Sequence, residues 1–335
     1  MLFVTYYMTN LSLALATYNE EENIIDCIKS CKGLVDEIVV VDGSSRDKTG
    51  ELALKAGAVV IRTQNVSMFH INKQKAIEAC TGDWILQLDA DERVTSELAE
   101  EIRKVISMSE EELLQYQNNL KEKRLFVRHQ QLVQSESSHS MQSGADAHLK
   151  SESHPQLITA QGPRLHTIAS DSKYNAFFIP RLNYFLGGYL RSGGVYPDGV
   201  IRLFRKGKAY LPCKDVHELM VVEGKTGWLA HPLIHKDSPT FKRYLERNSR
   251  YINRLVIELK AESIKLKAQN KDVQLSTLTF QLWQCITWML ILPIFTFFSL
   301  LIRHKGILDG WRGVVFAFFS AIRFARAYVR FIVRK

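Results

Sequence analysis

Cysteine is scarce in this chain of 335 residues, and the spacing of its five cysteines fits neither a zinc site nor a disulfide framework. An odd, scattered set of this kind indicates reduced thiols, as in a cytoplasmic compartment. The N-terminus lacks the basic segment and cleavage site of a secretory signal, because its apolar run at Leu2–Met8 is short and leads into a predicted strand. The five cysteines are Cys27, Cys31, Cys80, Cys213 and Cys285.

Acidic residues are almost missing from the last 35 residues of the chain. Leu301–Lys335 contains eight Lys or Arg against a single Asp, so most of the net charge of +9 lies there and the remainder is close to neutral. A basic segment interleaved with aromatic residues suits an anionic surface. Because the excess charge is confined to this apolar segment, we expect no nucleic-acid partner.

The first hundred residues alternate apolar strands with helices. Strands that are apolar along their whole length and separated by helices indicate a parallel sheet covered on both faces. We therefore predict an α/β fold with a doubly wound, mostly parallel sheet flanked by helices, and a ligand site at the carboxyl ends of the strands. The expected strands are Leu11–Ala16, Glu37–Val41, Ala58–Arg62 and Asp83–Leu88, and the expected helices are Glu20–Cys31, Asp47–Ala56, Asn72–Ala79 and Ser96–Ser107.

A polar stretch interrupts this pattern between residues 109 and 172. From His129 to His154, 15 of 26 residues are Ser, Gln or His, and none is aromatic. Such a segment buries too little apolar surface to offset the entropy lost on ordering. We interpret residues 109–172 as a solvated, disordered insertion, and the spacing of the four histidines in His129–His154 does not favour a metal site.

The C-terminal section, residues 273–335, is apolar and then basic. Val273–Ile302 contains no charged residue, and Leu282–Ile302 alone is long enough to span a bilayer, although Pro293 interrupts it. Beyond it, arginines recur at helical spacing among aromatic residues, which is typical of a helix lying in the headgroup plane. We predict helices that associate with an anionic membrane surface, peripheral or re-entrant, with a single span left open. The arginines are Arg323, Arg326, Arg330 and Arg334.

Three polar motifs stand at successive predicted strand ends. Asp89-Ala90-Asp91 follows an apolar strand, and two carboxylates at this spacing can converge on one hard divalent cation, which in turn can neutralise a diphosphate. Ala16–Glu20 and Asp42–Ser45 end the first two strands. Each motif alone fits a solvated turn. Together they favour a site at one edge of the sheet.

The order of these motifs resembles family 2 glycosyltransferases with the GT-A fold, and in particular the branch of lipopolysaccharide core β-glucosyltransferases. The resemblance extends over nearly the whole chain except residues 109–172. The matching segments are Ala16–Glu21, Val40–Thr49, Lys73–Ala76, Gly82–Glu92, Gly193–Asp198, Ile201–Gly207, Val216–Glu218 and Gly306–Gly310.

The resemblance implies a donor site built from residues of the first half of the chain. It implies that Asp91 ligates Mn²⁺ or Mg²⁺, with Asp89 at the metal or near the ribose or sugar. It also implies that Asp42 reads the nucleotide base. The nucleoside pocket and the nucleotide would further be contacted by Thr17, Tyr18, Glu20 and Lys73.

The same resemblance implies an inverting displacement, which requires one base at the attacking hydroxyl. Glu218 is the expected base, with His217 beside it and Asp198 as the reserve, since a carboxylate is ionised near pH 7 without any shift of its pKa. A structural role for the His217–Glu218 pair stays open. Arg202 and Arg205 are expected to contact phosphate or acceptor.

Four segments follow from these expectations. Residues 10–108 and 173–265 would form the nucleotide-sugar-binding and acceptor-binding halves of a GT-A domain, with 109–172 inserted and 273–335 at the membrane. The expected activity moves a hexose from a nucleotide sugar, taken as a UDP-sugar, to a lipid-linked or cell-envelope glycan at the cytoplasmic face of the cell membrane.

Two other functions remain open at this point: an inactive membrane-bound scaffold and a sugar-nucleotide pyrophosphorylase. The second normally has a glycine-rich loop after its first strand, which Thr17–Glu22 lacks. The chain also lacks the Gln-x-x-Arg-Trp motif of processive synthases, so a single addition is favoured.

Overall fold

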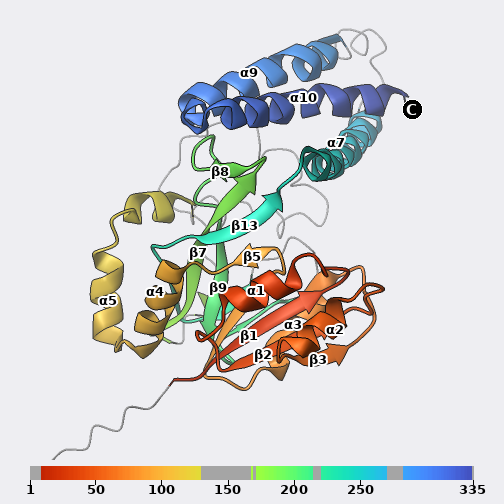
Figure 1. Cartoon of the computed structure of the whole chain (residues 1–335). Helices are drawn as coiled ribbons and strands as arrows, with labels where there is room; N and C mark the ends of the chain where they lie inside the picture. The colour runs from red at the N-terminus through yellow and green to blue at the C-terminus, as the bar shows by residue number, and fades with distance from the viewer. Residues whose placement is uncertain (1–8, 130–166, 169–170, 214–219, 270–281, 334–335) are drawn as a thin grey trace, which may run out of the picture. The chain divides into compact units, whose positions relative to one another are not determined.

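The computed structural model describes residues 9–129, 167–168, 171–213, 220–269 and 282–333 (Figure 1). The chain divides into two compact units. Unit 1 comprises Met1–Ser137, Gly162–Leu182 and Pro197–Lys236, and unit 2 comprises Ser138–Gln161, Asn183–Tyr196 and Asp237–Lys335. Each unit has a hydrophobic core of its own.

Unit 1 is built on a mixed sheet with the strand order β3-β2-β1-β4-β9-β7-β13-β5. The first four strands in this order pair in parallel, and β9 is antiparallel to β4. A small second sheet contains β10, β11 and β6. The strands are β1 Leu11–Thr17, β2 Glu37–Asp42, β3 Val59–Arg62, β4 Trp84–Leu88, β5 Glu92–Arg93, β6 Thr167–Ile168, β7 Tyr174–Phe185, β9 Gly199–Arg205, β10 Ala209–Tyr210, β11 Val221–Glu223, β12 Lys225–Trp228 and β13 Leu233–Ser238.

Helices cover both faces of the parallel strands. Alternate residues of a strand point to opposite faces, so Leu13 and Leu15 pack in one apolar cluster with α1 and α4, whereas Ala14 packs in the other with α3. The predicted doubly wound α/β fold is therefore confirmed. The helices of unit 1 are α1 Ile24–Ser30, α2 Thr49–Lys55, α3 Phe69–Ala79, α4 Ser96–Ser107 and α5 Glu110–Asn118.

The ordered part of unit 1 extends beyond the boundary expected at residue 109. Ser109 and Glu112 form a reciprocal capping box that starts α5, and residues 123–129 are helical as well. Gln117 is buried, donating to the carbonyl of Trp228 and accepting from its amide. The sequence pattern missed these helices because their buried positions are few among polar ones. The remainder of the expected insertion, 130–166, lies outside the described residues.

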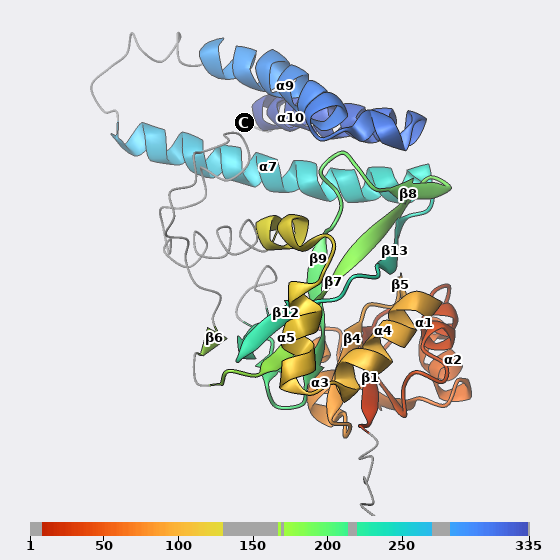
Figure 2. The ribbon, with the colours of Figure 1, turned by 90° about the vertical axis from the view of Figure 1, so that its left-hand side faces the viewer.

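The described part of unit 2 consists of helices, a short strand and the ends of β7 and β13. Its longest apolar element, which we call the apolar helix, is Leu282–Arg303. It contains α9 between two π-helical turns, and Figure 2 shows it beside α10 and α7. The elements are β8 Gly188–Leu190, α7 Phe241–Gln269, α9 Leu292–Phe298, a 3₁₀ turn at Gly306–Asp309 and α10 Trp311–Val333.

The division of the second half of the chain differs from the one expected. We expected 173–265 to form one half of a catalytic domain, but α7 shares its apolar cluster with α10 and therefore belongs with the C-terminal helices. Asn183–Tyr196 joins them, because the carboxylate of Asp309 accepts the amides of Arg191 (3.0 Å) and Ser192 (2.9 Å). Residues 270–281, where the expected C-terminal section begins, lie outside the described residues.

Candidate active site

The carboxyl ends of β1 and β2 bring together the first two motifs. Thr17 and Asp42 are direct partners in the parallel register. Asp42 is buried and accepts the hydroxyl of Ser45 at 2.5 Å. The hydroxyl of Thr17 is also buried, yet it has no hydrogen-bond partner among the residues that the structure describes. A buried, unsatisfied hydroxyl at a strand end is suited to a polar ligand.

The turn after β1 is held by the loop after β2. Asn19 adopts a left-handed conformation (φ 56°), and its amide donates to the hydroxyl of Ser45 at 2.9 Å. The amide of Glu20 donates to the hydroxyl of Thr49 at 2.8 Å. These bonds fix the turn that carries Tyr18, whose side chain is 39% exposed and therefore accessible to a ligand.

Asp89 is neutralised by two cations from different elements. Its Oδ1 lies 2.5 Å from Nζ of Lys73 on α3, and its Oδ2 lies 2.6 Å from a guanidinium nitrogen of Arg202 on β9. Burial would raise the pKa of Asp89, but Arg202 and then Lys73 outweigh burial and hold it well below the ordinary value. Because both oxygens are engaged, this geometry favours a role in positioning Lys73 over a role as metal ligand.

A buried row of charges continues from Asp89 through Glu92. Glu92 is completely buried, and its Oε1 lies 2.7 Å from Arg202 and 3.5 Å from Arg181. Its Oε2 accepts the amide of Asp89 at 2.9 Å. Arg181 in turn binds Asp198 at 3.0 Å. Buried carboxylates are tolerated only with partners of this quality, so the row holds Asp89 in one position.

Asp91 faces a histidine that the sequence pattern did not identify. Oδ2 of Asp91 lies 3.6 Å from Nε2 of His235, and the backbone carbonyl of Asp91 accepts the amide of Lys236 at 2.8 Å. Antiparallel pairing of β5 with β13 sets this contact, because His235 stands directly opposite Glu92.

The Asp91–His235 pair fits a divalent cation. Two ligand atoms at about 2.1 Å from one octahedral ion lie roughly 3 Å apart, so a separation of 3.6 Å needs only a small adjustment. Within the described part of the chain, no group of three or more His, Cys, Asp or Glu side chains is placed to hold a metal.

The two arginines expected to contact phosphate separate in the structure. Arg202 is buried against Asp89 and Glu92. Arg205 stands opposite Trp84 in the antiparallel β4–β9 register, at the other end of β4 from Asp89, and its guanidinium lies 4.5 Å from the Trp84 ring. Strand geometry therefore removes Arg205 from the cluster at the carboxyl edge.

The expected base and its neighbour, Glu218 and His217, lie outside the described residues. Asp198, the reserve, lies near the buried charges through its ion pair with Arg181. Residue Gly199 donates its amide to Nε2 of His129 at 2.9 Å, and burial lowers the pKa of that histidine. His129 thus has a packing role and is not part of a solvated loop.

Three residues of the cluster were not predicted: Glu92, Arg181 and His235. Glu92 is adjacent to the Asp89–Asp91 motif, so its position after a buried strand was an available signal. Nothing in the local sequence distinguishes Arg181 or His235, because strand pairing between distant segments brings them to the motif.

Comparison with known proteins finds a family match over part of the chain. Residues 12–152 match the family described as Glycosyl transferase family 2. The chain is 38% identical over 109 residues to a TPR repeat-containing protein of Synechococcus elongatus, covering 32% of this chain and 27% of that protein. It is 37% identical over 114 residues to an uncharacterized glycosyltransferase of Rickettsia typhi, covering 34% and 39%. The predicted resemblance to family 2 is confirmed.

One relative has a more specific description. The lipopolysaccharide core biosynthesis glycosyltransferase LpsC of Rhizobium meliloti is 32% identical over 105 residues, covering 30% of this chain and 38% of that protein. In each of these relatives the match spans well under two thirds of the relative's length. The similarity to each of these relatives covers about a third of this chain.

Similar solved structures include glucosyl-3-phosphoglycerate synthase from Mycobacterium tuberculosis in complex with Mn²⁺ and UDP-glucose. Identity is 24%, and the match covers 30% of this chain and 38% of that chain with a TM-score of 0.26. A likeness of this size carries no weight for function. The GT-A assignment depends on the family match and on the sheet described above.

Proposed function

From the match of residues 12–152 to glycosyltransferase family 2, we propose that this chain moves a hexose from a nucleotide sugar to an acceptor hydroxyl with help from a divalent cation. One observation carries the proposal: residues from three strand ends and α3 converge at the carboxyl edge of the parallel sheet. There the Asp91–His235 pair stands close to the Lys73–Asp89 pair. This is the edge at which open α/β sheets bind their ligands.

The nucleoside would bind at the ends of β1 and β2. Asp42 lies deep between the strands and would accept from a base N–H, while the unsatisfied hydroxyl of Thr17 would gain a partner. Tyr18 and Glu20 line the same turn. We propose a UDP-sugar because uracil offers one N–H donor to a carboxylate.

Asp91 and His235 would hold Mn²⁺ or Mg²⁺, and Lys73 would bind the diphosphate. When bound, the cation neutralises charge that develops on the departing diphosphate. Lys73 is held between Asp89 and the ring of Phe69, 5.1 Å from its centroid, so its ammonium group is oriented before the donor arrives. The contribution of Asp89 is therefore to orient Lys73.

Glu218 is the proposed base for an inverting single displacement, with His217 beside it. A base must reach the attacking hydroxyl and be ready to take its proton. The reserve, Asp198, forms an ion pair with the Arg181 guanidinium at 3.0 Å, so one of its carboxylate oxygens is already engaged. We therefore retain Glu218 in this role.

For the acceptor we propose a lipid-linked or cell-envelope glycan at the cytoplasmic face of the membrane. Two observations support this: similarity to a protein described as acting in lipopolysaccharide core biosynthesis, and the apolar helix. Among the described residues, this helix is the one long and apolar enough to cross a bilayer. The contact with an anionic membrane surface, peripheral or re-entrant, is part of the proposal.

Donor binding is the direct test. A panel of nucleotide sugars is added to the full chain with and without Mn²⁺, and the shift in melting temperature is measured, because a ligand that binds the folded state stabilises it. We expect a UDP-sugar to stabilise the protein in a Mn²⁺-dependent way, and Asp91→Ala to lose that dependence. Asp83→Ala, at the other end of β4, is the matched control and should keep it.

Two outcomes would redirect the proposal. Stabilisation by nucleoside triphosphate with a sugar phosphate, followed by pyrophosphate release, would indicate a pyrophosphorylase. Donor binding without turnover on any envelope glycan extract, together with no slow hydrolysis of the donor, would indicate the inactive scaffold.

A further inference from the structure

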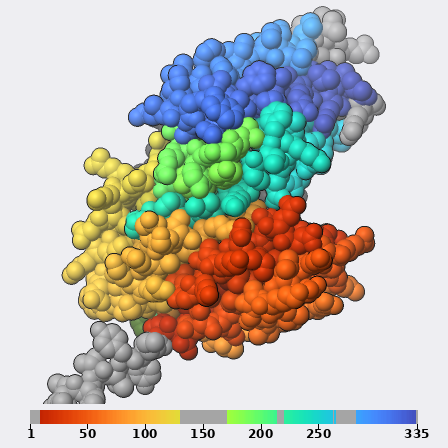
Figure 3. Space-filling model, viewed as in Figure 1, coloured from red at the N-terminus to blue at the C-terminus, as the bar shows by residue number. Residues whose placement is uncertain are grey.

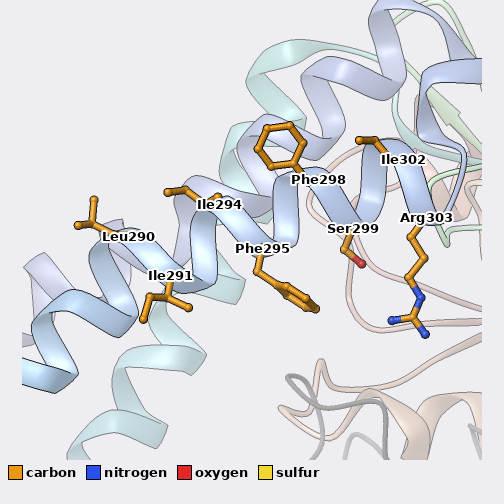
Figure 4. A pocket seen from close by; sticks show the side chains of 8 residues that line it. All are labelled: Leu290, Ile291, Ile294, Phe295, Phe298, Ser299, Ile302 and Arg303. Carbon is orange, nitrogen blue, oxygen red and sulfur yellow. The ribbon is translucent and has the colours of Figure 1, made fainter.

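The apolar helix of unit 2 exposes its side chains along its full length. It has 22 residues with a mean hydropathy of 2.3 in its most apolar window, and none of that window is buried. Figure 4 shows two rows of side chains at i, i+4 spacing along a groove of about 690 Å³. One row comprises Leu290, Ile294, Phe298 and Ile302, and the other Ile291, Phe295, Ser299 and Arg303.

The exposed apolar surface continues past the end of the helix. Ile307 and Leu308 in the 3₁₀ turn and Trp311 at the start of α10 are all more than half exposed. In the space-filling view, the light-blue atoms of the helix lie along the edge of unit 2, where no other described atoms cover them on the face in view (Figure 3). A contiguous exposed surface of this extent indicates a partner that excludes water.

The packing of α10 and α7 determines how such a partner can approach. Trp288 packs in the cluster that contains Ile252 of α7 and Phe324 of α10, with ring centroids of Trp288 and Phe324 5.9 Å apart. The apolar helix and α7 therefore both pack against α10, and Figure 1 shows the apolar helix alongside α10. Asn248 of α7 donates to the carbonyl of Phe319 at 3.3 Å, extending this contact along α10.

If the apolar helix crossed the bilayer, the parts of α10 and α7 that pack with it would enter the hydrocarbon as well. At 1.5 Å per residue the apolar helix is about 33 Å long, which matches the hydrocarbon thickness. Arg323, next to Phe324 and thus level with Trp288, would then lie in hydrocarbon, as would the exposed Arg250 of α7. Hydrocarbon offers neither water nor counter-charge to these groups. With the helix axis in the membrane plane, only the exposed face of the apolar helix enters lipid.

The charge beside the exposed surface suits anionic headgroups. Arg303, Lys305 and Arg312 flank the turn, whereas Asp309 is the one acidic residue between positions 282 and 333. Asp309 already accepts the amides of Arg191 and Ser192, so it presents little charge to a partner. Basic residues near the surface and apolar residues between them are the pattern of helices that lie in the headgroup plane.

We propose that the apolar helix and the turn after it insert into one leaflet of an anionic lipid bilayer with the helix axis in the membrane plane, so that the chain does not cross the bilayer there. This inference rests on the proposed membrane partner and is independent of the transfer chemistry.

Accessibility of the two helix ends tests the orientation. Cys213→Ser and Cys285→Ala remove the two cysteines that are not buried, and a single cysteine is then introduced as Gln284→Cys or Lys305→Cys. Each full-length variant is bound to preformed vesicles of phosphatidylcholine and phosphatidylglycerol, recovered by flotation and treated with a membrane-impermeant maleimide before and after detergent. Leu54→Cys, exposed on α2 of unit 1, is the control for full labelling.

We expect both ends to label to the same extent as Leu54→Cys before detergent is added. Labelling of one end only until detergent is added would show a crossing helix, and protection of both ends would show deep burial; either result overturns the in-plane orientation while the membrane partner stands. Failure to float with anionic vesicles would remove the membrane partner as well, whereas donor binding and turnover, measured on the same samples, would be unaffected.

Discussion

The two units depart from the usual arrangement of a folded protein in opposite ways. Unit 1 buries charge: Glu92 is fully buried, with Arg202 and Arg181 around it. Unit 2 exposes apolar surface: Phe295 and Phe298 are each about half exposed. Burying charge and exposing apolar surface both cost free energy. The proposed ligands stand at these two places, a phosphorylated donor in unit 1 and lipid in unit 2.

The two units also differ in whether the buried charge or the exposed apolar surface has a partner within the protein. In unit 1, Asp89 and Glu92 are matched by cations at 2.5–2.7 Å. The exposed face of the apolar helix is not covered by any described residue. The charged side chains of unit 1 are therefore in position before a ligand binds, which favours precise chemistry. Contact with a membrane requires only that the polarity of the protein surface match that of the lipid.

The largest expected effect concerns the base in the transfer reaction. Glu218→Gln removes the proton acceptor while retaining shape, so we expect the transfer rate to fall about 10²–10⁴-fold with donor binding unchanged. Steady-state kinetics with a measured donor affinity check this. A change confined to KM would reassign Glu218 to positioning, and Asp198→Asn would then be the next variant to assay.

Next in size is the cost of breaking the buried charges. Arg202→Met leaves the Glu92 carboxylate with Arg181 as its one remaining cation within 4 Å among the described residues, and we expect the free energy of unfolding of unit 1 to fall by about 3–5 kcal/mol. Arg205→Met on the same strand removes a partly exposed arginine, so a loss of about 1 kcal/mol or less is expected. If denaturant titrations gave the same loss of unfolding free energy for both variants, the buried charges around Glu92 would have no special role in stability.

A smaller effect is expected from making the exposed face of unit 2 polar. Phe295→Ser with Phe298→Ser removes two half-exposed rings from lipid contact, and we expect vesicle affinity to fall roughly 10–100-fold. Flotation with anionic vesicles measures it. Leu54→Ser replaces an equally exposed apolar residue of unit 1 and should leave the affinity unchanged. The melting temperature of both variants should stay near that of the wild type.

The smallest expected effect is a pH dependence of the stability of unit 1. Because the folded-state pKa of Asp89 is depressed, its ion pairs contribute stability that is present above the unfolded-state pKa of about 3.9 and is lost as pH falls through the folded-state value. We expect unit 1 to lose stability on acidification below about pH 4, and Asp89→Asn to flatten this dependence. Thermal melts from pH 7 to pH 3 test it, and an unchanged slope in Asp89→Asn would contradict it.

Local pattern was sufficient for most of unit 1. The helix predicted at Ser96–Ser107 has those bounds in the structure, and β2 extends one residue beyond the predicted strand. Both follow from short-range causes: Thr95 caps the helix by accepting the amide of Leu98, and an uninterrupted apolar run forms a strand that is covered on both faces. The Asp89–Asp91 motif was identified for the same reason, since a strand end is visible in a stretch of a few residues.

Pairing between distant segments could not be predicted from the local sequence pattern. The helix α5 was missed because its few buried side chains, such as Leu113 and Gln117, contact residues far along the chain. α7 was assigned to a catalytic half because its apolar stripe fits any partner, and only the tertiary structure shows that this partner is α10.

The amino-acid order was therefore enough to establish the parallel sheet, the polar motifs at its edge and the apolar character of residues 282–303, because each depends on neighbours within one element. The tertiary structure decided which side chains meet. It paired Asp91 with His235, engaged both oxygens of Asp89 and packed Trp288 of the apolar helix against α7 and α10. These contacts join residues up to about 140 positions apart, and no local propensity encodes such a distance.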